Sequence, residues 1–215
     1  MFLTILIYFL TVVISYLLGG ISMARIVSKT FYHEDITQKG SGNPGSINMG
    51  RNYGLFTMIF VLFLDMLKAA VPCLIALFVG GRVLLYVAGL SCIVGHVYPI
   101  YYKFKGGKGL ACSLGVFAVA NPMWLGIILV LGAIMIFITD IGSLTTLLML
   151  TALTVIEYIN PLNYGSIAIY VLLGLIYLLI LVRHRGNIVR LFTLKEGKMG
   201  LRKSLFKRRN KKDDE

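Results

Sequence analysis

Residues Leu55 to Gly80 read LFTMIFVLFLDMLKAAVPCLIALFVG, a long apolar run that contains two charged residues, Asp65 and Lys68. A helix rises about 1.5 Å per residue and the hydrocarbon core of a bilayer is about 30 Å thick, so about 20 apolar residues are enough to cross it. This stretch therefore predicts a transmembrane helix and indicates a membrane protein.

The composition of the whole chain agrees with this prediction. Apolar residues make up 58% and charged residues 14% of the 215 positions. The surface of a soluble domain is about a quarter charged or more, so a soluble monomer is excluded, together with disordered, collagen-like and disulfide-linked classes. Cys73, Cys92 and Cys112 lie in apolar runs without paired or metal-ligand spacing, and no metal or cofactor site is expected.

Outward from this stretch, the same criterion predicts an all-α polytopic membrane protein with about seven transmembrane helices. They cover Phe2 to Ile26, Leu55 to Gly80, Val83 to Tyr101, Gly109 to Ala120, Met123 to Ile138, Ser143 to Tyr158 and Gly165 to Val182. The fourth and fifth are short and meet at Asn121-Pro122, which either separates two spans or kinks one longer helix. The first is expected to be retained, because it lacks the positive start of a signal peptide and is too long for one.

The basic residues indicate the orientation, since Lys and Arg gather on cytoplasmic flanks. With the N-terminus outside and the C-terminus cytoplasmic, 19 of the 21 basic residues lie on the cytoplasmic side. Of the other two, Arg82 lies outside and Lys68 lies within a span. The net charge of +12 then reflects topology and not nucleic-acid binding. We expect one transmembrane domain, residues 1–200, followed by a basic cytoplasmic tail, residues 201–215.

Three polar motifs fall on the predicted inner face, at residues 40–54, 95–109 and 183–198. The first contains GSGNPG at residues 40–45, which matches GxGxxG but lacks the preceding strand of a dinucleotide-binding fold. Its glycines still allow backbone N–H groups to approach an anion, and Ser41 and Arg51 add a hydroxyl and a bidentate cation. The motif predicts a phosphate site; a flexible turn with an anchoring arginine is the alternative.

The second motif reads GHVYPIYYKFKGGKG at residues 95–109. It does not fit a Walker A loop, because Tyr102 and Gly109 occupy positions that require glycine and Ser/Thr, so nucleotide hydrolysis has no support. A GGKG turn that opens a helix nevertheless presents N–H groups, a favourable dipole and the Lys108 ammonium to a phosphate monoester. For His96 we favour a structural hydrogen bond.

The third motif, RHRGNIVR at residues 183–190, follows the last predicted span. If the helix continues, His184 and Asn187 share one face that can hold a hydroxyl and a phosphate. The alternative is a positively charged cluster that stops membrane transfer, which explains the arginines but not His184 or Asn187.

In the second span, Asp65 and Lys68 also share a face, either as a structural ion pair or as part of a site. Ser143, at the inner start of the sixth span, could donate to an anion or cap its helix.

These motifs, with FLDMLK at residues 63–68 and Glu196-Gly197-Lys198, resemble the bacterial acyl-phosphate:glycerol-3-phosphate acyltransferase family over nearly the whole chain. The resemblance implies a multi-pass enzyme of the cell membrane whose active site faces the cytoplasm. Such an enzyme transfers a fatty acyl group from acyl phosphate, and not from acyl-CoA or acyl carrier protein, to the 1-hydroxyl of glycerol 3-phosphate. Its products are lysophosphatidic acid and phosphate, and it serves phospholipid biosynthesis.

The resemblance also implies roles for individual residues, with no metal and no cofactor. The expected catalytic residues are Ser41, Arg51, Lys108, His184 and Asn187. The expected substrate- or phosphate-binding residues are Gly42, Asn43, Gly45, Asn48, Gly106, Gly107, Gly109 and Ser143. Supporting roles are expected for Asp65, Lys68, His96 and Glu196. The chain departs from the family pattern at Ile47, Ala69 and Leu194-Lys195, and Ile47 removes one hydroxyl that a threonine would supply.

Acyl phosphates are already activated, and the sequence has neither a GxSxG motif nor a Cys/His pair that would indicate a nucleophile. We therefore expect the acyl group to pass directly to the acceptor hydroxyl, with catalysis due mainly to the positioning of the two substrates. The proton acceptor is either His184 or the phosphate of the donor, and we favour the phosphate.

The expected partners are the two substrates, the bilayer and a soluble enzyme that produces acyl phosphate. A transporter of small phosphorylated anions and a non-catalytic scaffold are the rival functions, and transport is disfavoured because the motifs gather at one face.

Overall fold

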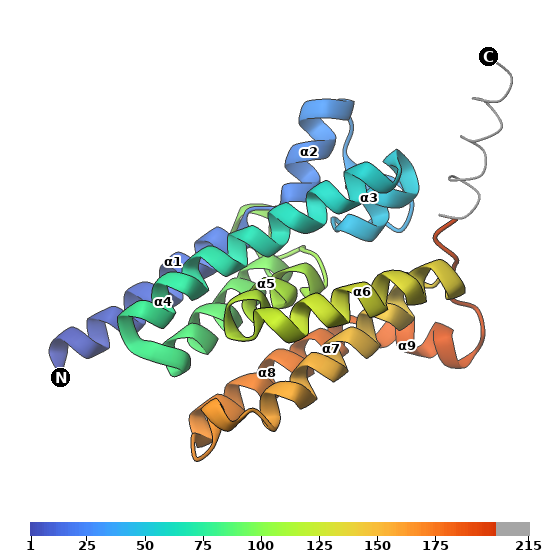
Figure 1. Cartoon of the computed structure of the whole chain (residues 1–215). Helices are drawn as coiled ribbons and strands as arrows, with labels where there is room; N and C mark the ends of the chain where they lie inside the picture. The colour runs from blue at the N-terminus through green and yellow to red at the C-terminus, as the bar shows by residue number, and fades with distance from the viewer. Residues whose placement is uncertain (201–215) are drawn as a thin grey trace, which may run out of the picture.

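The computed structural model describes residues 1–200 of the chain (Figure 1). These residues form α-helices and short 3-10 helices and contain no strand. The α-helices are α1 (Phe2–Gly20), α2 (Met23–Tyr32), α3 (Ser46–Tyr53), α4 (Leu55–Val97), α5 (Leu110–Ala120), α6 (Pro122–Thr139), α7 (Gly142–Tyr158), α8 (Ile167–Arg183) and α9 (Arg185–Phe192). The 3-10 helices are η1 (Ile36–Gln38), η2 (Ile100–Tyr102) and η3 (Pro161–Asn163). The predicted basic tail lies outside the described residues.

Several helices are long and apolar enough to cross a membrane. Within residues 1–200, these candidates are Phe2–Tyr32, Leu55–Tyr102 and Pro122–Thr139, and a fourth is added if the bent pair α8 and α9 counts as one span. The apolar helices α5 and α7 are shorter. The all-helical prediction is therefore confirmed for the described residues, while the count of seven spans stays a prediction.

The two predicted spans between residues 55 and 101 form the two arms of α4. Helical geometry breaks at Gly80 (φ −147°) and Gly81 (φ +73°), and the positive φ at Gly81 is one that glycine adopts without strain. The arms run antiparallel, since Lys68 on the first arm contacts His96 on the second. This hairpin brings residues 65–68 next to the second polar motif.

The structure also determines two further helix boundaries, at the end of the first predicted span and at Asn121-Pro122. The first predicted span, Phe2 to Ile26, contains parts of two helices, because α1 ends at Gly20 and Ile21 and Ser22 are extended before α2 begins. Asn121 is non-helical (φ −158°, ψ 74°) and separates α5 from α6, so Asn121-Pro122 lies between two helices. Proline suits the first turn of α6, because its missing N–H has no partner there anyway.

Close backbone contacts join α1 to the second arm of α4. A Cβ added to Gly19 would lie 2.0 Å from the carbonyl oxygen of Cys92, and one added to Gly95 would lie 2.1 Å from that of Tyr16. Small residues allow this approach, which is typical of helix pairs in membranes. The contact fixes the end of α4 that carries His96.

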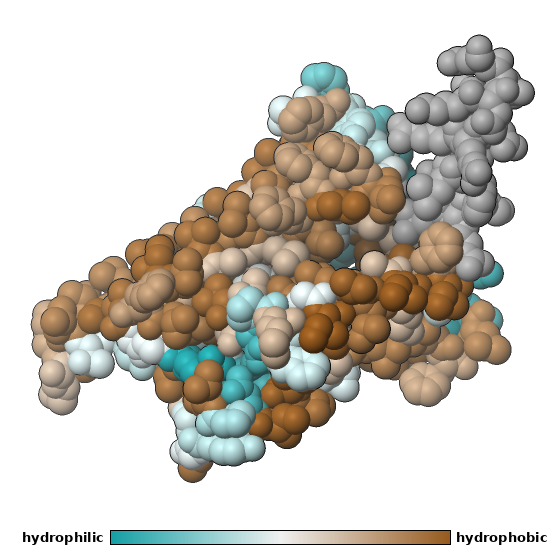
Figure 2. Space-filling view, viewed as in Figure 1, coloured by the Kyte–Doolittle hydropathy of each residue, from teal (hydrophilic) through white to brown (hydrophobic). Residues whose placement is uncertain are grey.

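Apolar side chains cover most of the face seen in Figure 2. Phe2, Phe56 and Phe78 are each at least 80% exposed. A soluble surface does not display such residues in number, whereas lipid solvates them. The surface therefore agrees with a membrane location.

A buried polar cluster joins the segment of α4 just after its break to the ends of α5 and α7 that lie away from the three motifs. Glu157, at the end of α7, is fully buried and accepts hydrogen bonds from Arg82 (2.7 Å), Asn121 (2.9 Å) and Asn163 (2.9 Å). The Tyr86 hydroxyl also donates to this carboxylate. We call these residues the Glu157 cluster. It ties α4, α5 and α7 together, and it was not predicted from the sequence.

Candidate active site

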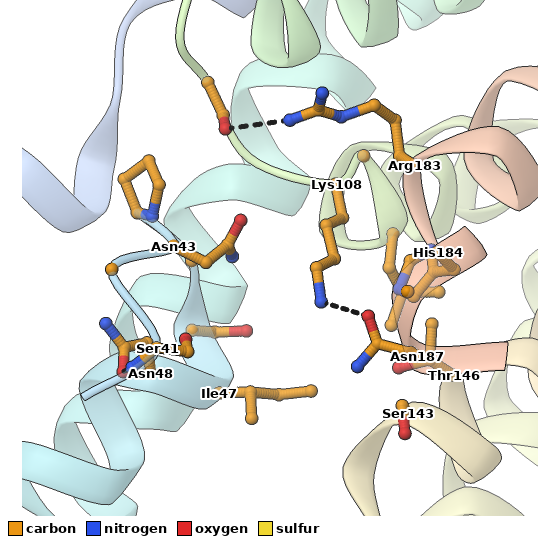
Figure 3. Close-up of a pocket in the computed structure, with 18 of the residues that line it drawn as sticks. Ser41, Asn43, Ile47, Asn48, Lys108, Ser143, Thr146, Arg183, His184 and Asn187 are labelled. Atoms are coloured by element: carbon orange, nitrogen blue, oxygen red, sulfur yellow. Dashed lines mark hydrogen bonds between the residues drawn. The ribbon is translucent and has the colours of Figure 1, made fainter. Parts of the chain in front are cut away.

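A cavity of about 970 Å³ lies where the three polar motifs meet. Its walls come from α2, the loop after η1, α3, α4, the loop before α5, α7 and the junction of α8 and α9. Figure 3 shows Ser41 and Asn43 on one wall, His184 and Asn187 on the facing wall, and Lys108 between them. The structure thus brings the three motifs together at one end of the helices.

Most of the predicted site residues line this cavity. They are Ser41, Gly42, Asn43, Gly45, Asn48, Arg51, Asp65, His96, Gly106, Lys108, Gly109, Ser143, His184, Asn187 and Glu196. Gly107 and Lys68 do not line it, although both contact His96, which does. Within residues 1–200, no group of three or more His, Cys, Asp or Glu side chains is arranged to hold a metal ion.

The cavity wall carries an excess of positive charge. The acidic residues that line it are Asp65 and Glu196, and the basic ones are Arg25, Arg51, Lys105, Lys108, Arg183, Arg185 and Arg190. Charges of one sign that line a cleft raise the local concentration of ligands of the opposite sign. The cavity is therefore suited to anions that carry more than one charge.

Asn48 holds the first motif in its shape. Its Oδ1 accepts the N–H of Ser41 (3.0 Å), and its Nδ2 donates to the carbonyl groups of Ile36 (3.3 Å) and Lys39 (2.9 Å). Gly40 (φ +56°) leaves room for this amide, since a Cβ there would lie 2.3 Å from Oδ1. Asn48 is 1% exposed and its amide is occupied within the loop, so its contacts are those of a residue that positions Ser41.

The glycine-rich loop is shaped by contact with His96. The N–H of Gly107 donates to the carbonyl of His96 (3.1 Å), so this N–H is not available to an anion as the sequence suggested. A Cβ at Gly106 would lie 2.1 Å from the same carbonyl, and one at Gly107 would lie 2.2 Å from His96 Nε2. Both positions therefore need glycine, and α5 begins directly after this loop, with its first N–H groups at the cavity.

Lys108 extends from the loop across the cavity. Its Nζ donates to Asn187 Oδ1 (2.5 Å), as Figure 3 shows. Burial lowers the pKa of Lys108 to about 8; Arg190, Arg51 and Arg183 also lower it, while Glu196 raises it. Lys108 is therefore still mostly an ammonium at neutral pH.

Glu196 joins three side chains from two different helices. It accepts hydrogen bonds from Ser143 Oγ (2.8 Å) and Asn187 Nδ2 (2.7 Å), and it pairs with Arg190 Nε (2.7 Å). Burial alone would raise the pKa of Glu196, but these hydrogen bonds outweigh burial and hold it below its ordinary value. The ionised carboxylate thus orients Asn187, which in turn receives Lys108. Ser143 is not a helix cap, because α7 has Ile141 at its N-cap and no side-chain cap.

Residues 196–200, here called the strap, cross from α9 to the corner between α6 and α7. Arg51 Nη2 donates to the carbonyl of Gly197 (3.1 Å). The N–H groups of Met199 (2.8 Å) and Gly200 (3.0 Å) donate to the backbone carbonyl and the carboxylate of Asp140. The strap thus connects the first motif to the third.

His184 lies at a bend of 62° between α8 and α9. The last span therefore does not continue as one straight helix through the third motif, which was the condition for His184 and Asn187 to share a helix face. His184 and Asn187 nevertheless line the same cavity. The carbonyl of Ile180, 2.9 Å from His184 Nδ1, can only accept, so Nδ1 carries the proton and Nε2 is an acceptor. Burial lowers the pKa of His184 to about 4, so the imidazole is neutral at physiological pH.

The charged pair on the first arm of α4 lies beside His96, and its Asp65 lines the cavity directly. Lys68 Nζ lies 2.7 Å from Asp65 Oδ1 and donates to the carbonyl of Ile21 (2.6 Å). It also contacts His96 Nδ1 (3.0 Å). His96 thus has a hydrogen-bond partner in Lys68, while its predicted structural role stays a prediction.

Two arginines that were not among the predicted site residues contact the glycine-rich loop. Arg25 Nη2 donates to the carbonyl of Lys105 (3.2 Å), and Arg183 Nη2 contacts those of Gly106 (3.5 Å) and Gly107 (3.4 Å). These contacts fix the carbonyl groups of the loop. No local pattern predicts the Arg25 contact, because 80 positions separate its partners.

Comparison with known proteins identifies relatives over nearly the full length. Residues 9–194 match the family described as glycerol-3-phosphate acyltransferase. The chain is 38% identical over 194 residues to the glycerol-3-phosphate acyltransferase of Macrococcus caseolyticus (strain JCSC5402), with 90% of this chain and 98% of the relative covered. It is 36% identical to glycerol-3-phosphate acyltransferase 2 of Bacillus anthracis, with 88% of this chain and 98% of that relative covered.

Solved structures show the same fold. The chain is similar to the crystal structure of PlsY (YgiH), an integral membrane glycerol 3-phosphate acyltransferase, in its glycerol 3-phosphate form. The TM-score is 0.83 at 31% identity, over 93% of this chain and 98% of that one. The lysophosphatidic acid form of PlsY gives a TM-score of 0.81 at 30% identity.

Proposed function

Because this chain belongs to the glycerol-3-phosphate acyltransferase family and is an integral membrane acyltransferase of lipid biosynthesis, we propose that its acyl donor is acyl phosphate. The reaction would transfer the acyl group to the 1-hydroxyl of glycerol 3-phosphate and release lysophosphatidic acid and phosphate. One observation carries this proposal: seven basic residues line the cavity together with the glycine-rich loop. Acyl phosphate and glycerol 3-phosphate together bring two phosphoryl groups to the reaction, and this excess of cations can neutralise both.

Positioning supplies most of the rate enhancement in this proposal. The hydroxyl oxygen attacks the acyl carbonyl carbon, a new C–O ester bond forms, and the bond to the phosphate oxygen breaks. Well-oriented reactants can gain about 7 to 11 kcal/mol from proximity alone. Arg51, Lys108 and the N–H groups at the start of α5 hold the leaving phosphate, and one such donor is worth about 2.7 to 4 kcal/mol.

The facing wall would hold the acceptor. Asn187 is oriented by Glu196, and Ser143 donates to the same carboxylate, so both lie where the phosphate of glycerol 3-phosphate can bind. His184 presents Nε2 as an acceptor for the attacking hydroxyl. A base with a pKa of about 4 takes up a proton poorly at neutral pH, and so we propose that an oxygen of the donor phosphate accepts the proton and that His184 orients the hydroxyl.

The substitution His184→Gln tests this assignment. Glutamine can accept a hydrogen bond near the position of Nε2 but cannot act as a base, so kcat is expected to stay within about tenfold of wild type. Steady-state kinetics with both substrates measures it. A loss of about four orders of magnitude in kcat with unchanged KM would make His184 the general base instead.

The substitution Arg51→Lys tests the phosphate clamp. The charge is kept but the planar fork is lost, and so kcat/KM is expected to fall about a hundredfold. Kinetic assays on purified protein, with the unfolding temperature as the check on the fold, measure this. Activity close to wild type in a folded Arg51→Lys enzyme would contradict the clamp.

We also propose the orientation: seven spans, the N-terminus outside, and the cavity and the C-terminus at the cytoplasmic face. The support is that all three motifs line one cavity, while Arg82, the basic residue expected outside, belongs to the Glu157 cluster at the other helix ends. Single cysteines at Lys198 and at Gly165 in sealed vesicles test it. Impermeant thiol reagents are expected to label Lys198→Cys from the cytoplasmic side and Gly165→Cys from the outer side.

The decisive assay is release of phosphate by the purified protein from palmitoyl phosphate with glycerol 3-phosphate, with lysophosphatidic acid measured alongside. Release that requires the acceptor and equals the lipid formed is the expected result. Palmitoyl-CoA in place of palmitoyl phosphate is expected to give no product. Product from the thioester and none from the acyl phosphate would overturn the choice of donor.

A further inference from the structure

His96 carries a hydrogen-bond donor that the mechanism above does not use. It lies near the end of α4, lines the cavity and is 7% exposed. Its Nδ1 contacts Lys68, whereas its Nε2 has no hydrogen-bond partner within residues 1–200. Nε2 is not among the unpaired atoms that are shut off from solvent, so it is open to the cavity. A donor at a cavity wall without a protein partner is available to a ligand.

Lys68 determines which ring nitrogen of His96 carries the proton. Its Nζ contacts the carbonyl of Ile21 (2.6 Å), the carboxylate of Asp65 (2.7 Å) and His96 Nδ1 (3.0 Å). An ammonium has three donors and no acceptor, so Nδ1 of His96 must accept. The proton of the neutral imidazole is therefore on Nε2.

The fold places this Nε2–H at the glycine-rich loop. A Cβ on Gly107 would lie 2.2 Å from Nε2, so the imidazole lies directly against the backbone of the loop. The carbonyl of His96 holds the same residue through the Gly107 N–H (3.1 Å). Lys108 and the start of α5 line the cavity beside it. A side-chain donor thus lines the same cavity as a cation and the first N–H groups of a helix.

We propose that the Nε2–H of His96 donates to a phosphoryl oxygen bound at the glycine-rich loop, with Asp65 and Lys68 as positioning residues that set its tautomer. This proposal rests on the proposed function and adds a substrate-contacting residue to it. The two buried histidines of the cavity then have opposite tautomers. His96 donates to phosphate through Nε2, whereas His184 donates to Ile180 through Nδ1 and accepts through Nε2.

The variants His96→Asn and His96→Gln separate the two ring nitrogens. Asparagine places its oxygen near Nδ1 and keeps the contact with Lys68, but no donor reaches the position of Nε2; the longer glutamine amide reaches it. Binding of inorganic phosphate to the protein in lipid nanodiscs is expected to weaken about tenfold or more in His96→Asn. In His96→Gln it is expected to stay within about threefold of wild type.

His33→Asn is the matched control, because it makes the same chemical change outside the cavity. His33 is exposed, and its φ of +54° is one that asparagine tolerates. Phosphate binding by His33→Asn is expected to equal wild type. Phosphate binding by His96→Asn equal to that of this control would overturn the proposal.

A second measurement needs no variant and decides the question if His96→Asn does not fold. In the wild-type protein with 15N-labelled histidine, NMR is expected to show the His96 proton on Nε2 and the His184 proton on Nδ1. Saturating inorganic phosphate is expected to shift the His96 Nε2–H resonance. A proton on Nδ1 of His96, or an Nε2 resonance that phosphate leaves unchanged, would overturn the proposal.

Kinetics distinguish the two substrates that carry a phosphoryl group. A rise in KM of His96→Asn confined to acyl phosphate assigns the contact to the donor, and one confined to glycerol 3-phosphate assigns it to the acceptor; either supports the proposal. Unchanged KM values and unchanged phosphate affinity would overturn it while acyl transfer itself stands. A wild-type protein without acyl transfer contradicts the proposed function, and phosphate binding and NMR still decide the role of His96.

Discussion

Replacing Lys108 by Met is expected to lower kcat/KM by about a thousandfold, the upper range for loss of one donor to a developing negative charge. Lys108 lies between the two cavity walls and contacts Asn187, so its ammonium can reach phosphoryl groups on either side. Methionine fills similar space without the charge. Steady-state kinetics with acyl phosphate and glycerol 3-phosphate measures the loss, and a Lys108→Met enzyme within tenfold of wild type would remove Lys108 from the mechanism.

The same lysine predicts the pH dependence. With a pKa of about 8, the ammonium form of Lys108 falls as the pH rises above that value. Because the charged form is the one required, kcat/KM is expected to fall about tenfold per pH unit above pH 8. A bound phosphate favours the ammonium, and so the corresponding fall in kcat is expected at higher pH.

Lys108→Arg is the control for this profile. Arginine stays charged throughout the accessible pH range, so the alkaline fall in kcat/KM is expected to disappear, whatever the absolute rate. Non-enzymatic hydrolysis of the acyl phosphate is subtracted at each pH. An alkaline fall that stays at pH 8 in Lys108→Arg would assign it to another group.

Replacing Glu157 by Leu is expected to lower the free energy of unfolding by about 3–5 kcal/mol, the cost of leaving one partner of a buried ion pair alone. The Arg82 and Glu157 side chains are 17% and 1% exposed, so water compensates only in part for the lost carboxylate. The amides of Asn121 and Asn163 lose the same acceptor. Thermal unfolding of the purified protein in detergent measures the change.

The double variant Arg82→Met/Glu157→Leu is the matched control. It removes both charges together, so it is expected to recover a large part of the stability lost in Glu157→Leu. At temperatures where these variants stay folded, kcat is expected to equal wild type, because the Glu157 cluster lies at the opposite ends of α5 and α7 from the cavity (Figure 1). A Glu157→Leu protein that unfolds like wild type would show that the cluster does not stabilise the fold.

The apolar runs predicted the helices well, because hydrophobicity over about 20 residues is a local property of the sequence. The gathering of Ser41, Lys108 and Asn187 around one cavity also followed from sequence, since charge asymmetry placed all three motifs on one face. The motifs themselves carried the resemblance that indicated the family.

The contacts between distant segments could not be predicted in this way. Glu157 is a single acidic residue in an apolar helix, and its partner Arg82 lies 75 positions away. A charge inside a predicted span is itself a signal of a buried polar site, and it could have drawn attention to Glu157 as it did to Asp65. The bend at His184 had no proline to mark it, and the contact between Arg25 and the glycine-rich loop depends on tertiary structure alone.

The strap has a consequence for how the enzyme is made. Glu196, which orients Asn187 and pairs with Arg190, follows α9 in the chain, so the ribosome adds it only after every described helix has been synthesised. A nascent chain with its earlier motifs already in the bilayer still lacks this carboxylate and the Gly197 carbonyl that receives Arg51. Half-made copies therefore lack contacts that complete the cavity, and we expect acyl transfer only by molecules whose synthesis has passed the strap.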